Sequence, residues 1–169
     1  SSLDIKKLQE VIGENKKITN ISLVKIDRAN YWQVYNQSVS GNKKHAASKG
    51  MDLMKNRTVP APTTIYVSTK DYTMLADGEM KYANYLATLF SKHQPTEIVK
   101  TTVITKFEDE YGFVNKRLPV WKVNYNSNNK ERFYVEACTG KLAAHRNDKD
   151  LIEGYSFAML HKNHFMDFA

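Results

Sequence analysis

The sequence predicts an α+β protein with two tandem units, each an antiparallel sheet packed against a helix. The first observation behind this prediction is a series of short β-branched and aromatic segments, interspersed with segments whose apolar residues recur at helical spacing. The second is that the two halves of the 169-residue chain can be aligned with one another. With 41% hydrophobic and 25% charged residues, the composition is that of a folded globular chain, not a disordered one.

The first unit, residues 1–95, begins with a helix and a hairpin. Apolar residues recur at helical spacing over 3–12, where Ser2 or Asp4 can cap the start and Gly13 can end the helix. Two strands follow on either side of a turn: 18–26 and 31–35.

A polar, basic segment then interrupts the first unit. We interpret residues of about 36–62 as a long insertion that precedes a third strand at 63–68. A helix is predicted over 79–92, because apolar residues such as Ala83 and Leu86 recur there at helical intervals.

The second unit, residues 96–169, consists of predicted strands followed by a terminal helix. The strands are expected at 96–107, 119–125, 132–137 and 141–145. A tight turn at Thr139-Gly140 separates the last two, because glycine readily adopts positive φ. The helix over 154–168 is apolar on more than one face, which is typical of a buried helix or of one that enters lipid.

Matching positions in the two halves suggest an internal duplication. Trp32 corresponds to Trp121, and the pair Tyr66-Val67 corresponds to Tyr134-Val135. A three-stranded ribbon has one apolar face that a single helix can cover, and two such units can share burial by packing together. The residues expected in or near the cores are Trp32, Val34, Tyr66, Trp121, Val123, Tyr134 and Leu160.

The second unit resembles a PepSY domain. The resemblance rests on the run Leu118-Pro-Val-Trp-Lys-Val-Asn-Tyr and on Phe133-Tyr-Val-Glu-Ala-Cys-Thr-Gly-Lys-Leu. Glu136 stands where the family usually has Asp, and Ala137 stands where Pro is common. The tail with Leu160-His-Lys-Asn-His-Phe is similar to the junction that leads into a membrane helix in PepSY-associated transmembrane proteins.

This resemblance implies a place and a role for the chain. It implies a non-catalytic module on the extracytoplasmic, periplasmic side of a bacterial cytoplasmic membrane, belonging to a larger membrane protein of the iron-regulated kind. The second unit would then end in a juxtamembrane helix that includes the tail 159–168, and the partners would be membrane segments of the parent chain. No apolar run here reaches the roughly 20 residues that a spanning helix needs, so such segments are expected outside this sequence.

Two alternative functions stay open. PepSY modules also occur in peptidase propeptides, so the chain could inhibit a peptidase or bind another extracytoplasmic protein. It could also be the extracytoplasmic part of a haem-linked redox protein that resembles siderophore reductases. In that case His161 and His164, three residues apart on one helical face, would be haem or metal ligands in the intact protein.

The remaining reactive residues predict no catalysis. Within this fragment we expect no cofactor, because no further ligand stands at a recognised spacing from the two histidines. Cys138 has no adjacent base except His145 on the next strand, and a packed thiol is the default. The carboxylates of 108–110 are expected to be solvated surface in a turn.

The net charge of +7 suits nucleic acid, anionic lipid or an acidic partner, and composition alone does not choose among them. The basic segment from Lys43 to Arg57 has no interleaved aromatic residues, so nucleic-acid binding by base stacking is not expected. Cations beside a bilayer gain roughly 1 kcal/mol each from anionic lipid, which favours a lipid surface over nucleic acid, but we expect a solvated loop ahead of both.

Overall fold

The computed structural model describes residues 3–38, 58–59, 63–112 and 116–149. These residues form two antiparallel sheets, one three-stranded in the order β1-β2-β3 and one four-stranded in the order β4-β5-β6-β7. The predicted α+β class is therefore confirmed. Among the described residues, no helix is both long and apolar enough to cross a membrane.

The first sheet follows a short helix. Its elements are α1 (Ile5–Ile12), β1 (Lys16–Ile26), β2 (Ala29–Ser38) and β3 (Ile65–Ser68). The Asp4 carboxylate caps α1 by accepting a hydrogen bond from the backbone N–H of Lys7. Asp4 is one of the two capping residues that the sequence predicts. Gly13 ends the helix with a φ of 97°, a conformation that favours glycine.

The second sheet also follows a helix. Its elements are α3 (Gly78–Phe90), the 3₁₀ turn η1 (Pro95–Glu97), β4 (Ile98–Ile104), β5 (Val120–Tyr125), β6 (Arg132–Glu136) and β7 (Lys141–Arg146). The strands agree with the predicted positions, although β4 begins after η1. Between β3 and α3, an isolated bridge pairs Val67 with Met74.

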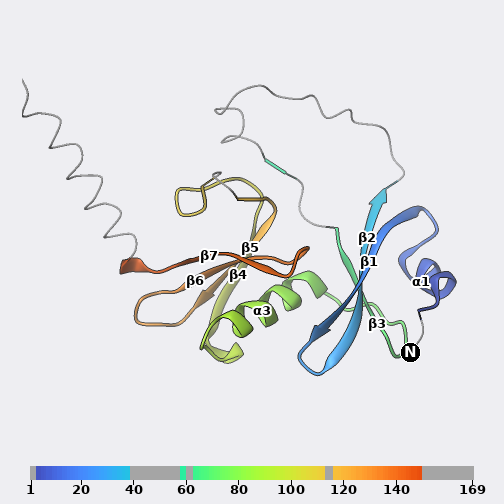
Figure 1. Ribbon diagram of the computed structural model, residues 1–169, viewed down its shortest axis with the longest axis horizontal. Helices are drawn as coiled ribbons and strands as arrows, with labels where there is room; N and C mark the ends of the chain where they lie inside the picture. Colours follow the sequence, from blue (N-terminus) through green and yellow to red (C-terminus); the bar gives the residue numbers. More distant parts are fainter. Residues whose placement is uncertain (1–2, 39–57, 60–62, 113–115, 150–169) are drawn as a thin grey trace, which may run out of the picture.

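Helix α3 lies between the two sheets, and α1 covers the other face of the first sheet (Figure 1). The central core accordingly joins Tyr66 of β3, Leu86 of α3 and Val123 of β5. A second core places Leu8 of α1 against Val34 of β2. A third core covers the outer face of the second sheet: Ile104, Tyr111, Val120 and Tyr134.

Each sheet carries its tryptophan at the same place in the strand register. Trp32 lies opposite Leu23 on one side and Val67 on the other. Trp121 lies opposite Val103 and Val135.

The irregularities of the two edge strands match as well. β1 has a bulge between Ile18 and Asn20, and β4 has one between Ile98 and Lys100. In each edge strand the bulge ends three residues before the residue that pairs with the tryptophan of the neighbouring strand. That residue is Leu23 in β1 and Val103 in β4. The two sheets thus share both register and bulge.

Most of the expected core residues are buried. Val34, Tyr66, Val123 and Tyr134 are at most 1% exposed. Trp32 and Trp121 are only partly buried, yet each packs against a core. Leu160 and the predicted helix over 154–168 lie outside the described residues, as does the basic segment from Lys43 to Arg57.

Candidate functional site

A pocket of about 650 Å³ opens between the two sheets at the N-terminal end of α3. We call it the inter-sheet pocket. Its walls come from β3, from the segment that leads into α3, and from β4 and β5. Six aliphatic side chains line it: Ile65, Met74, Leu75, Ala76, Met80 and Val103. Its size and mainly apolar lining are those of a small-molecule site.

Gly78 allows the first turn of α3 to lie directly against β3. A Cβ atom at this position would lie 2.7 Å from the Cβ of Tyr66, closer than side-chain carbon atoms approach in proteins. The preceding residue, Asp77, has a φ of 54° and turns the chain into the helix. This close approach brings the next residue, Glu79, into the inter-sheet pocket.

Glu79 is the only carboxylate of the pocket that is buried, with 9% of its surface exposed. Burial raises the pKa of its carboxyl group, because a charge is poorly solvated there. Trp121 and Thr64 act in the opposite direction, since their donors favour the charged carboxylate. The indole N–H of Trp121 is itself buried and closes no hydrogen bond of regular geometry.

A hydrogen bond within the first sheet ties the pocket residue Tyr66 to Gln33, and two others join the first sheet to the segment after β6. The Gln33 side-chain amide donates to the Tyr66 hydroxyl at 2.7 Å and to the backbone carbonyl of Ala137 at 3.0 Å. The Tyr35 hydroxyl donates to the carbonyl of Cys138. Burial raises the pKa of Tyr35 to about 12, so this hydroxyl keeps its proton and remains a donor at neutral pH.

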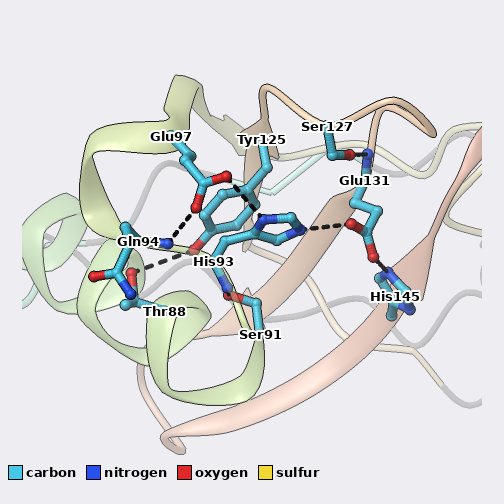
Figure 2. A network of polar contacts seen from close by, with 9 residues as sticks. All are labelled: Thr88, Ser91, His93, Gln94, Glu97, Tyr125, Ser127, Glu131 and His145. Atoms are coloured by element: carbon cyan, nitrogen blue, oxygen red, sulfur yellow. Dashed lines mark hydrogen bonds and ion pairs between the residues drawn. The ribbon is translucent and has the colours of Figure 1, made fainter.

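A separate polar network lies at the other end of α3 (Figure 2). His93 Nε2 lies 2.5 Å from one carboxylate oxygen of Glu131, and His145 Nε2 lies 3.0 Å from the other. The second ring nitrogen of His93 faces Glu97 at 3.3 Å, and the ring stacks on Tyr125. This network, which we call the His93 network, ties the end of α3 to the β5–β6 loop and to β7.

The His93 network predicts a pH-dependent contribution to stability. The pKa of His93 is raised from 6.5, chiefly by its hydrogen bond to Glu131, so its contribution is complete below pH 6.5 and is lost as pH rises through the folded-state pKa. The pKa of Glu131 is lowered from 4.5, chiefly by the hydrogen bond from His93. Its contribution to stability is therefore complete above pH 4.5 and is lost as the pH falls through the folded-state pKa. We expect His93→Gln to reduce the fall in urea midpoint between pH 6 and pH 8.

A neighbouring charge provides the control for this prediction. Lys92→Gln removes one positive charge from an exposed position beside His93, and its pH dependence should match that of the unchanged chain. An unchanged slope between pH 6 and pH 8 in His93→Gln would show that the network does not contribute.

The structure describes only some of the site residues that were considered from the sequence. His161 and His164 lie outside the described residues, so their proposed role as ligands stays a prediction. Cys138 is exposed in its turn, and His145 contacts Glu131 and stacks on Phe133. Within the described ranges, no three His, Cys, Asp or Glu side chains are grouped so that they could hold a metal ion.

One acidic residue was misjudged from sequence. Glu110 is not solvated surface. Its carboxylate contacts Lys122 Nζ at 2.9 Å, Arg132 Nε at 3.1 Å and the Tyr134 hydroxyl at 2.9 Å. Although burial alone would raise its pKa, these partners lower it. Alternation places the side chains of Lys122, Arg132 and Tyr134 on the outer face of the second sheet, and this signal was available in the sequence.

The pocket residue Glu79 was also missed. It stands on the same helical stripe as Ala83 and Leu86, so a carboxylate interrupts an apolar face, which is the signal that could have found it.

No family model matches this chain, and no curated protein or solved structure matches it.

Proposed function

We propose that the chain is a non-catalytic, PepSY-like module on the extracytoplasmic side of a bacterial membrane protein, where it binds a ligand or partner and regulates the parent. In this proposal the two sheets descend from one duplicated unit. The parent's own membrane segments are its first partners, and an anionic lipid surface or another extracytoplasmic protein is a further candidate partner.

The matched tryptophan register is the observation that carries the proposal. Trp32 and Trp121 occupy equivalent positions, and both edge strands bulge at the same distance from the tryptophan's partner. Each tryptophan packs into the core that contains the helix preceding its sheet, α1 for Trp32 and α3 for Trp121. We therefore propose that each unit runs from helix to sheet, with the junction before Gly78. This proposal places α3 in the second unit, whereas the boundary at residue 95 predicted from the sequence places it in the first.

The inter-sheet pocket supports the binding part of the proposal. It lies where the two units meet, which is a common location for a ligand site, and Gln33 links the pocket residue Tyr66 to Ala137 of the second unit. A ligand in this position would contact both units. It could therefore change how they pack, and so act on the parent protein.

A peptidase-inhibiting module is the second candidate. β1 is an 11-residue strand at the edge of its sheet, and within the described ranges only β2 pairs with it. Such an edge can accept an extended peptide as an added strand. The haem-linked alternative depends on His161 and His164, and no observation on the described residues favours it.

Labelling of the single cysteine tests the location. In cells that express the intact parent protein and whose outer barrier has been removed, we expect a membrane-impermeant maleimide to label Cys138 before lysis, because this residue is exposed. Burial raises the pKa of the thiol, so the reaction is run at pH 8 with long exposure.

The variant Cys138→Ser identifies the labelled position, because any signal that persists comes from elsewhere in the parent. Labelling of Cys138 that requires permeabilisation of the cytoplasmic membrane would place the module inside the cell and would refute the proposal.

A further inference from the structure

We propose that the inter-sheet pocket binds an ammonium group carried on an apolar body, with the Glu79 carboxylate as its counter-charge. The inference rests on the proposed ligand-binding role of this module and names the chemistry of the ligand. It follows from three features of the pocket: a buried acid, aromatic walls and an aliphatic lining.

The buried acid lacks a cation. No Lys, Arg or His among the described residues forms an ion pair with Glu79, whereas Glu97, Glu110, Glu131 and Asp148 each have a basic partner. A buried carboxylate without a counter-charge is costly, and it responds by retaining its proton. Burial does raise the pKa of Glu79, and an ammonium group of a ligand would supply the charge that the chain does not.

The aromatic walls suit the same group. Trp121 lines the pocket, is only partly buried and acts directly on the Glu79 carboxylate, whereas Tyr66 also lines the pocket but is 1% exposed. A cation near an aromatic face gains electrostatic energy from the ring, more so when the site is partly desolvated. A carboxylate flanked by aromatic rings is therefore better matched to an organic cation than to an anion.

The aliphatic lining determines what carries the ammonium group. Ile65, Met74 and Val103 offer apolar surface and no hydrogen-bond donors from their side chains. An alkyl chain fits such a surface, because its burial is favourable by about 0.8 kcal/mol per methylene group.

Two other readings of Glu79 are weaker. An acid in the first turn of a helix complements the helix dipole, but an exposed side chain does so without the cost of burial, and Glu79 is buried. The net charge of +7 attracts anions at a distance, yet salt screens charges beyond roughly 8 Å at physiological ionic strength. Within the pocket, Glu79 and Asp77 outnumber the one lining cation, Lys16.

Calorimetric titration of the 169-residue chain with n-hexylamine, hexan-1-ol and hexanoate tests the ligand class. We expect hexylamine to bind at least about tenfold more tightly than hexanol, and hexanoate to bind most weakly, because only the amine pairs with Glu79. Binding of the amine should weaken between pH 7 and pH 5, since protonation of Glu79 removes the counter-charge.

Two matched variants assign the effect to one residue. Glu79→Gln keeps the shape of the side chain and should weaken hexylamine binding by about tenfold while leaving hexanol binding unchanged. Glu10→Gln makes the same charge change at an exposed position of α1, outside the pocket, and should alter binding by less than about threefold. Thermal melts of both variants check that they remain folded.

A free amine and a lysine side chain are the two sources of this chemistry. A capped tripeptide with a central lysine, compared with its norleucine analogue, distinguishes them: tighter binding of the lysine peptide than of hexylamine identifies a peptide ligand, and the reverse identifies a free amine. Equal binding of hexylamine and hexanol, or unchanged amine binding by Glu79→Gln, would overturn the inference. Labelling of Cys138 is independent of this result, so a wrong ligand class can be told from a wrong location.

Discussion

Replacing Gly78 with alanine is expected to lower the free energy of unfolding by about 1–3 kcal/mol. The added methyl group would meet Tyr66 Cβ at 2.7 Å, with two ring atoms of the same side chain also within 3 Å. Tyr66 cannot move aside, because it is 1% exposed and its hydroxyl accepts a hydrogen bond from Gln33. Alanine favours a helix over glycine by up to about 1 kcal/mol in the helix interior, and Gly78 is the first residue of α3, so the clash dominates.

Gly112→Ala is the matched control for this substitution. A Cβ atom at Gly112 would meet nothing within 4 Å, so the change should stay within about 0.5 kcal/mol of the unchanged chain. Urea denaturation at pH 7 measures both variants. Equal midpoints for the two variants would mean that α3 can move away from β3, and the inter-sheet pocket would then not have a fixed wall.

Local patterns were sufficient to predict the elements themselves. Asp4 and Gly13 mark the ends of α1 in the sequence as they do in the structure, because caps depend on neighbouring backbone groups. Trp32 and Trp121 could be matched across the chain because each stands in a strand whose alternation fixes the register.

The position of α3 between the sheets could not be predicted in this way. Its buried residues cover a wide face that includes Tyr82, Ala83 and Ala87, because the helix packs against both sheets. A helical period indicates which side of a helix is apolar, but it does not say how many neighbours cover that side. The inter-sheet pocket follows from this placement, and so it too was absent from the prediction.

Contacts between distant polar residues were equally out of reach. His93 and Glu131 are 38 residues apart, and Glu131 and His145 are 14 apart. Their meeting depends on where η1 leaves the end of α3 and on the loop between β5 and β6. Neither position is set by local periodicity, and so only the folded chain reveals the His93 network.

The second large effect is expected at Leu8, where Leu8→Ala should lower the free energy of unfolding by about 2–5 kcal/mol. Leu8 is fully buried between α1 and the first sheet, where it packs with Val34 and Val67. α1 has eight residues, too few to be stable alone, so it depends on this contact. One further tie is the hydrogen bond from the backbone N–H of Asp4 to the Tyr72 hydroxyl at 2.8 Å.

Leu89→Ala provides the comparison, because the same side chain is deleted from α3 at a position that is 61% exposed. The change at Leu89 should stay within about 0.5 kcal/mol, and both variants are measured by urea denaturation with far-UV circular dichroism. Similar losses at the two positions would mean that α1 does not cover the first sheet. That outcome would also contradict the proposed duplication. In the second unit α3 covers the apolar face of the sheet, and α1 would then not do the same for the first sheet.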